Sequence, residues 1–447
     1  MRIKAHKMIT KKIVFFLLLI GFQLSAQSKK WTLEECVDYA IKNNISVKQS
    51  ELDLKTSDID KLEAIGGFLP SLSGNANYSI NTGASINPVT NQFQNQTFKS
   101  FSASANTGLM LFNGLANWKT LQRAKLNKIA NSYRLDKMKD DIALSIANSY
   151  LQILFNKEQL KVQRNQNLIT KENIKRTQEL IEAGSLPAGD IFELQATDAS
   201  QEQQIIATEN TLLIAKIGLC QTLLLEDYIN FDISDEVVDV SMTNFTNVTQ
   251  ESILEKAKES VKDVKIAMAN VDVAKKDVAL SRSSYLPTLT GFLGYNTRWA
   301  ESTPFNFIDQ LTLFDGTAVG LQLSVPILNG LAIRGRVQRA KISQERSEFQ
   351  LRQAELDLER NVYQAYNDVI NAKKSFEAAQ KTLEARKQSF NFSKERYEVG
   401  LMNSFDFSQS TLAYENAQSE VLRTKYDYIF RTKILEFYFG IPLVKKQ

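Results

Sequence analysis

Two long stretches of the chain carry apolar side chains at helical spacing. Residues 115–183 and 336–399 contain neither Gly nor Pro, and in the second stretch apolar residues recur at steps of three and four that average near 3.5, the spacing of a helix-packing seam. The pattern predicts long helices over 115–183 and 331–399, each on the order of 100 Å at about 1.5 Å per residue. By themselves such helices are typical of a coiled-coil rod. The seam residues are Leu351, Ala354, Leu358, Val362, Ala365, Val369, Ala372, Phe376, Ala379 and Leu383.

Before each long helix, the apolar period changes to two. Apolar residues alternate there with polar ones, mostly Ser, Asn and Gln, in four runs of about ten residues. Such alternation predicts β-strands with one apolar and one polar face. We therefore expect strand pairs within 70–112 and 287–328, joined by polar loops over 81–98 and 300–316. The runs on the apolar faces begin at Leu72, Phe101, Leu293 and Val319 and end at Ile80, Leu111, Trp299 and Ile327.

An alternating strand fits a soluble sheet as well as a membrane one. The length of these four strands, their polar faces, and the aromatic residues Tyr78, Tyr295 and Trp299 on their apolar faces are typical of strands that span an outer membrane. These three side chains are predicted to face lipid. No stretch after the N-terminal region has the composition of an apolar spanning helix.

The whole order of elements occurs twice. Leu69-Pro70 returns as Leu286-Pro287, Asn113-Gly114 as Asn329-Gly330, and Gly184 with Asp190 as Gly400 with Asp406, at an offset of 216 or 217 residues. Such an offset predicts two copies of one structural unit. We assign the first repeat to 27–225, with a returning helix over 188–225, and the second to 251–443, with a returning helix over 404–440. Residues 226–250 are the predicted linker.

Four strands are too few to close a sheet in a membrane. Unpaired N–H and C=O groups at a sheet edge find no water in lipid, and the smallest closed membrane barrels have about eight strands. The chain must therefore share a barrel with identical copies. Two copies would give eight strands, and three would give twelve.

Composition narrows the function further. Residues 1–26 hold five basic and no acidic groups, and the basic groups precede an apolar run at 13–22, which predicts a secretory signal peptide. Without those residues the formal charge falls from +4 to −1, so nothing suggests nucleic-acid binding. The single histidine, His6, lies in that segment. Cys36 and Cys220 do not occupy equivalent places, so buried thiols are expected. We expect no enzyme activity, metal or cofactor.

Across about residues 31–443 this doubled order of strand pair, long helix, glycine turn and returning helix resembles the TolC-type outer-membrane efflux proteins. The resemblance implies a mixed fold: a homotrimer with a twelve-stranded β-barrel, continued by a twelve-helix periplasmic α-barrel. It also implies a passive exit channel for tripartite efflux or type I secretion. The implied partners are a periplasmic adaptor protein and, through it, an inner-membrane RND or ABC transporter. The segment 226–250 would form a belt around the tube. The resemblance does not identify the transported substrate.

The two turns at the far ends of the long helices are the predicted periplasmic gate. Gly184 and Gly400 are expected to end helices in a left-handed conformation, and Asp190 and Asp406 are expected to cap the returning helices. By the resemblance, the two aspartates face the mouth of the tube as rings of carboxylates. Tyr397 matches the tyrosine that, in the family, holds the entrance closed by bonding to the aspartate equivalent to Asp190. Glu193, one turn beyond Asp190, is also expected to line this mouth.

Met402 stands where the family's studied gate has an arginine, so that salt bridge is absent, and we expect a gate held by packing and by a bond from Tyr397 to Asp190. Exposed parts of the same turns would dock the adaptor. The expected docking residues are Gly184, Leu186, Gly400, Leu401 and Ser404.

Two alternatives from other classes remain open at this point. A trimeric outer-membrane adhesin or structural anchor also shares four strands per chain and adds a helical rod, but such anchors usually keep their strands in one block. A periplasmic coiled-coil scaffold without membrane strands would be extracted by salt alone.

Overall fold

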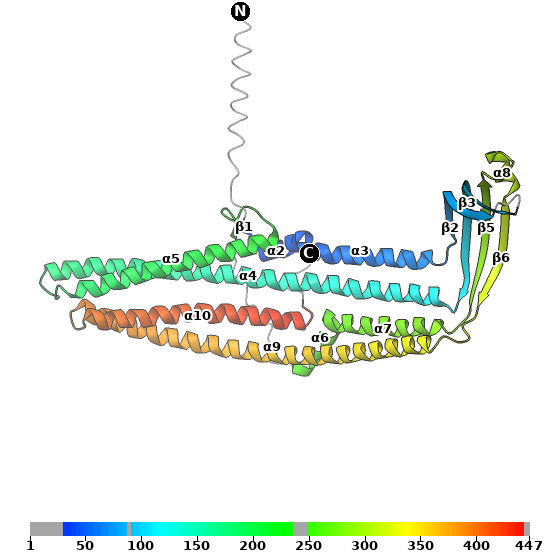
Figure 1. The fold of residues 1–447 in the computed structure, drawn as a ribbon. Helices are drawn as coiled ribbons and strands as arrows, with labels where there is room; N and C mark the ends of the chain where they lie inside the picture. The colour runs from blue at the N-terminus through cyan, green and yellow to red at the C-terminus, as the bar shows by residue number, and fades with distance from the viewer. Residues whose placement is uncertain (1–29, 87–90, 236–248, 442–447) are drawn as a thin grey trace, which may run out of the picture. The chain divides into compact units, whose positions relative to one another are not determined.

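The computed structural model describes residues 30–86, 91–235 and 249–441, and Figure 1 shows the order of their elements. The predicted signal peptide, residues 1–26, lies outside the described residues. Contacts divide the chain into two compact units, Met1–Lys48 with Met138–Ser260 and Leu358–Gln447, and Gln49–Lys137 with Val261–Asp357. Each unit takes residues from both sequence repeats, so the compact units do not coincide with the repeats.

The second of these units contains a four-stranded antiparallel sheet. Its strands are β2 (Ser71–Ile86), β3 (Phe93–Asn113), β5 (Thr288–Ala300) and β6 (Gly316–Ser324), hydrogen-bonded in the order β2-β3-β5-β6. The two strand pairs predicted from the alternating pattern therefore meet in one sheet. Among the described residues, β2 and β6 each have only one strand neighbour, so both edges of the sheet are open.

The register places the predicted apolar positions on one face. Tyr78 lies opposite Phe101, which lies opposite Trp299, while Tyr295 lies opposite Ala105. A register shift between Met110 and Phe112 marks a β-bulge near the end of β3. The apolar face is largely exposed in the single chain; Val319, for example, is 80% exposed.

Three details of the strand prediction are wrong. The run ending at Ile327 was too long, because β6 ends at Ser324, before Pro326, which has no N–H to donate to a ladder. The predicted loop 81–98 is mostly strand. Its Ser, Thr and Asn side chains pair across the ladder, as in the 2.9 Å contact between the hydroxyls of Thr82 and Thr97. The other loop, 300–316, contains a helix, α8 (Phe307–Leu313), that begins at an Asn306 cap.

The sheet joins its helices through a repeated pair of left-handed residues. Gly114 and Leu115 have φ of 65° and 64°, and Gly330 and Leu331 have φ of 58° and 66°. A Cβ at Gly114 would lie 2.6 Å from the Ser283 carbonyl oxygen, so this position tolerates only glycine. The helices of this unit are α3 (Ile45–Gly66), α7 (Lys262–Ser283) and the first parts of α4 (Ala116–Glu182) and α9 (Ala332–Glu398).

The other unit holds the remaining parts of α4 and α9 with α2 (Leu33–Asn43), α5 (Asp190–Leu223), α6 (Gln250–Ser260) and α10 (Ser404–Tyr438). The bounds of α4 and α9 lie within a residue of the predicted long helices. The main apolar core of this unit includes Ile146, Tyr150 and Leu219, with both cysteines. Cys36 and Cys220 are buried thiols that are not joined in a disulfide, as predicted. No helix in the described ranges is long and apolar enough to cross a bilayer.

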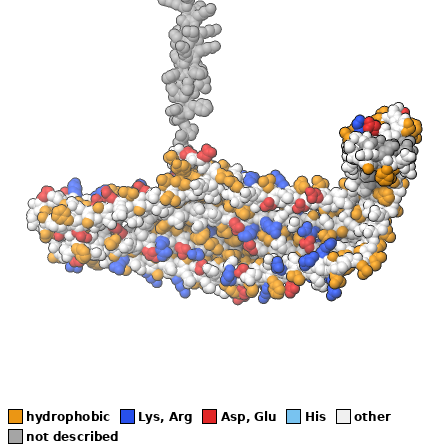
Figure 2. All heavy atoms as spheres, viewed as in Figure 1, with side chains coloured by type: hydrophobic (Ala, Val, Ile, Leu, Met, Phe, Trp, Pro, Cys, Tyr) orange, Lys and Arg blue, Asp and Glu red, His pale blue; other side chains and the backbone are white. Residues whose placement is uncertain are grey.

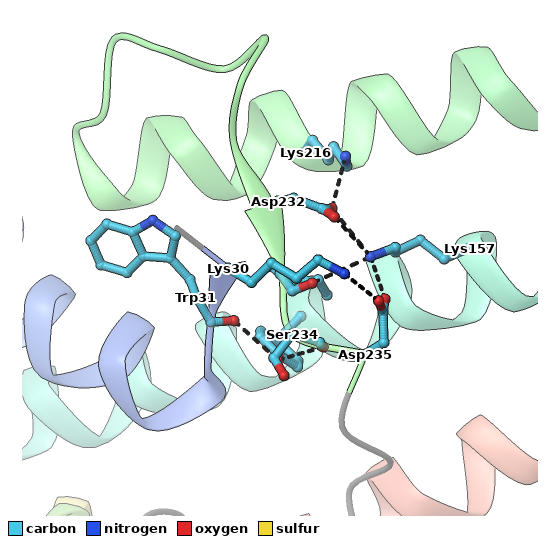
Figure 3. A network of polar contacts seen from close by, with 9 residues as sticks. Lys30, Trp31, Lys157, Lys216, Asp232, Ser234 and Asp235 are labelled. Atoms are coloured by element: carbon cyan, nitrogen blue, oxygen red, sulfur yellow. Dashed lines mark hydrogen bonds and ion pairs between the residues drawn. The ribbon is translucent and has the colours of Figure 1, made fainter. Parts of the chain in front are cut away.

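The first described residues pair with the first part of the predicted linker. Short strands β1 (Lys30–Trp31) and β4 (Asp232–Ile233) pair in parallel, and residues 236–248 of the linker lie outside the described residues. Figure 3 shows a charged network beside this pair, in which Lys157 contacts both Asp232 and Asp235. The network also contains Lys30–Asp235 at 2.6 Å and Lys216–Asp232 at 3.0 Å.

Candidate functional site

Each helical hairpin turns through a glycine in a left-handed conformation. Gly184 and Gly400 have φ of 74° and 73°. The N–H of the next residue bonds back to the carbonyl five residues earlier, from Ser185 to Leu180 and from Leu401 to Arg396. This is the Schellman arrangement that satisfies the last carbonyls of a helix. The left-handed helix ends expected at both glycines are confirmed.

The returning helices begin differently from the prediction. Asn403 caps α10, because its Oδ1 accepts the Asp406 N–H at 2.8 Å, while α5 follows Gly189, which offers no side chain. Asp190 and Asp406 therefore do not cap these helices, and that expectation is wrong. Both carboxylates lie in the first turn instead, where they interact favourably with the positive end of the helix dipole.

Behind the turns, four aromatic rings form a continuous stack. Tyr397 lies on Phe407, with centroids 4.6 Å apart and planes 4° apart, and Phe390 stacks on both Phe407 and Tyr414. Leu194 of α5 is buried in the same cluster, which therefore joins the two hairpins. We call these four rings the aromatic stack. Its members are spaced by seven residues on each helix, 390 and 397 on α9 and 407 and 414 on α10, a signal that the sequence analysis missed.

Met402 packs against the aromatic stack, together with Leu186. A flexible thioether side chain suits the edge of aromatic rings. Met402 thus adds apolar packing at this turn.

The hydroxyl of Tyr397 bonds to Thr177 of α4, not to Asp190. The two oxygens are 2.9 Å apart, and Thr177 is fully buried. The predicted Tyr397–Asp190 bond is absent within the described chain because a closer hydroxyl already satisfies the phenol. Burial raises the pKa of Tyr397, the Thr177 bond opposes this, and the charge of Asp190 adds to the rise. Tyr397 is therefore neutral at physiological pH.

One turn further along the returning helices lies a polar cavity of about 560 Å³. It is lined by amide and hydroxyl groups from α4, α5 and α10, together with Glu193 and Gln409. Glu415 also lines it and accepts a 2.6 Å hydrogen bond from Gln201. Burial raises the pKa of Glu415 to about 7. The structure thus places Glu193 in this cavity, and it reveals Glu415, which no sequence motif had marked.

The turns differ in how much they expose. Leu401 is 70% exposed, and Val399 and Phe405 beside it are exposed as well. Ser404, by contrast, is only 5% exposed, and Leu186 is partly buried against the aromatic stack. The expectation that Ser404 forms an exposed docking surface is therefore wrong, because this residue starts α10 on its packed side.

One unit of the chain contains a four-stranded sheet with open edges and an apolar face, and the other contains two packed helical hairpins. Both features are typical of outer-membrane channel proteins. The family model for outer membrane efflux proteins matches residues 36–223 and 253–439. The chain therefore belongs to the outer membrane efflux protein family, and it is an outer-membrane protein of the channel-forming, TolC-like type.

Relatives and solved structures agree with this membership. The chain is 23% identical to the proteases secretion protein PrtF of Dickeya chrysanthemi, covering 88% of this chain and 84% of PrtF. It is 22% identical to the outer membrane protein TolC of Escherichia coli, covering 92% and 83%. In fold it is similar to the Campylobacter jejuni CmeC outer membrane channel, with a TM-score of 0.74 at 17% identity over 92% of this chain and 86% of CmeC.

Proposed function

We propose that three copies of this chain form one twelve-stranded barrel, continued by a tube of twelve helices. The observation that carries the proposal is the sheet of four strands with two open edges, β2 and β6, and an exposed apolar face. In lipid each open edge would leave backbone groups without hydrogen bonds, at several kcal/mol per group. Pairing β6 of one copy with β2 of the next satisfies both edges, and twelve strands leave room for a lumen.

In this assembly the chain acts as a passive conduit. It carries out no chemical step, and the energy for transport comes from a partner in the inner membrane, an RND or ABC transporter reached through a periplasmic adaptor. Support comes from the named relatives, which include protease secretion proteins and TolC. The two repeats, 27–225 and 251–443, and a belt around the tube formed by the linker 226–250 belong to the same proposal.

The hairpins form the gate of this conduit. Threefold symmetry turns Asp190, Asp406 and Glu193 each into a ring of three acidic groups, which favours cations at the mouth. The aromatic stack holds α9 against α10, and Leu194 and the Tyr397–Thr177 bond link it to the other hairpin of the same copy, so opening requires these rings to shift as a block or separate. The exposed Leu401, with Val399, is the part of the turns best placed to contact an adaptor.

The decisive test combines mass with conductance. Purified mature protein in mild detergent should show a protein mass of three chains by light scattering, and should form discrete ion-conducting channels in planar bilayers. A stable two-chain or one-chain particle would refute the trimer. A trimer without conductance would refute the conduit and leave a structural anchor as the remaining explanation.

A further inference from the structure

The loop between β5 and β6 folds back onto the sheet as helix α8, which lies at the loop end of the strands in Figure 1. The ring of Phe307 lies 5.5 Å from that of Phe101 and 5.6 Å from that of Trp299. Since Phe101 and Trp299 lie opposite each other on the apolar face of the sheet, α8 contacts that face through Phe307.

A single buried amide holds α8 in place. Gln310 is 0% exposed, and its Oε1 accepts the Ala300 N–H at 2.9 Å. Its Nε2 donates to the carbonyl of Phe305 at 2.7 Å and to that of Ala300 at 3.1 Å. The hydroxyl of Thr297 also donates to the Leu311 carbonyl at 2.7 Å. The position of α8 is therefore built by specific bonds to β5.

This position leaves large apolar side chains uncovered. Ile308 is 65% exposed, and Phe305 and Leu313 are exposed as well. Figure 2 shows hydrophobic side chains on the visible surface of the sheet and its loop end. Covering an exposed Ile or Leu is worth about 1.5–3 kcal/mol, so three such groups on one short segment indicate an apolar environment.

Residues paired across neighbouring strands form rows, and the position of these rows along the strands gives the height of α8 along the membrane normal. From the Leu289 row to the Trp299 row the strand rises about 33 Å at about 3.3 Å per residue. With strands tilted by about 40°, this corresponds to about 25 Å, the height of the apolar band of an outer-membrane barrel. Beyond Trp299 comes the ion pair of Lys99 and Glu301, at 2.9 Å, and such charges avoid hydrocarbon.

We infer that α8 and the loop just before it form a lipid-contacting anchor at the outer-leaflet interface, in which Phe305, Ile308 and Leu313 enter the boundary between acyl chains and headgroups. Its surface is continuous with the lipid-facing side of the sheet, at the level where the aromatic row of Tyr78, Phe101 and Trp299 gives way to charge. The anchor rests on membrane insertion of the sheet and not on the number of copies.

The test uses a nitroxide attached to Ile308→Cys in the full chain, reconstituted in phosphatidylcholine vesicles. Power-saturation spectra compare collisions with oxygen, which concentrates in lipid, and with a water-soluble nickel chelate. Val319→Cys, in the middle of the apolar face, reports membrane insertion of the sheet, and Asp309→Cys is the matched control on α8. The wild-type chain, whose two cysteines are buried, serves as the labelling blank.

The anchor predicts an oxygen-to-nickel collision ratio at Ile308 that is several-fold above that at Asp309 and below that at Val319. A label at 308 that collides mainly with nickel, or with neither reagent, overturns the anchor while the Val319 result leaves the membrane sheet intact. Equal high ratios at 308 and 309 overturn the interfacial placement. A nickel-dominated signal at Val319 would overturn both the anchor and the proposed channel.

Discussion

Replacing Glu415 by Gln is expected to stabilise the compact unit that contains α5 and α10, by an amount that depends on pH. Glu415 lies in the polar cavity between α4, α5 and α10. Among the described residues that line this cavity, the only other ionisable group is Glu193, which is also acidic, and none is a cation that would compensate the charge of Glu415. Burial raises the pKa of Glu415 to about 7, from an ordinary value of 4.5.

The magnitude follows from the linkage between protonation and stability. A difference of one pKa unit between the folded and unfolded chain corresponds to about 1.36 kcal/mol. Because the pKa of Glu415 rises from 4.5 to about 7, its ionised form destabilises the folded state by about 3 kcal/mol. Below pH 4.5 the group is protonated in both the folded and unfolded chain and contributes nothing. As pH rises from 4.5 to 7, the unfolded chain loses this proton first, so stability falls; above pH 7 the deficit is constant. Glu415→Gln removes the deficit while it keeps the size of the side chain.

The expected gain is therefore about 1 kcal/mol at pH 5 and about 3 kcal/mol at pH 8. The assay is unfolding by guanidinium chloride in a Trp118→Phe/Trp299→Phe background, followed by fluorescence of the remaining Trp31, which packs against the core of the same unit. Glu420→Gln, five residues further along α10, is the matched control. Its pKa is lowered by Arg423, so its loss should slightly weaken the protein at pH 8. An equal effect of Glu415→Gln at both pH values, or a loss of stability at pH 8, would refute the reasoning.

Three further predictions concern the same unit. Phe407→Ala should cost about 3–5 kcal/mol and raise single-channel conductance, because it removes the centre of the aromatic stack, whereas Phe405→Ala, at an exposed site two residues away, should change neither. Tyr397→Phe and Thr177→Val each break the same buried bond, so each should destabilise by about 1 kcal/mol; a double variant that loses the sum of both would contradict the pairing. The pKa of Asp235 is lowered by bonds to Lys157 and then Lys30, so this network stabilises above the ordinary aspartate pKa and is lost as pH falls below it. Asp235→Asn should flatten the acid side of the stability profile, and an unchanged acid transition would count against the network.

Several features of the channel follow from local sequence. The lengths of α4 and α9 agree with the absence of Gly and Pro over 115–183 and 336–399, because helix propagation depends on residues within a few positions. Gly184 and Gly400 predicted the helix ends for the same reason. The alternating runs predicted the apolar face of the sheet, although Pro326 shortened β6 and the paired Thr82 and Thr97 extended the first hairpin.

The contacts of the gate were harder to predict from the sequence, because they join residues far apart in the chain. Tyr397 was marked as a latch, but its partner is Thr177, 220 residues away. Asn403 caps α10, whereas the sequence pattern pointed to Asp406, three residues later. Heptad spacing of Phe390 with Tyr397 and of Phe407 with Tyr414 was present in the sequence, yet only the meeting of α9 and α10 shows that the rings stack.

The sequence by itself determined the periodic elements, their doubled order and the family, because these depend on spacing along one segment. Tertiary structure alone decided which hydroxyl satisfies Tyr397, that Glu415 is buried without a cation, and that Gln310 folds α8 back onto the apolar face. Such outcomes depend on the rotation and axial position of neighbouring elements, and a shift of one residue along a helix or strand turns a different side chain toward the contact.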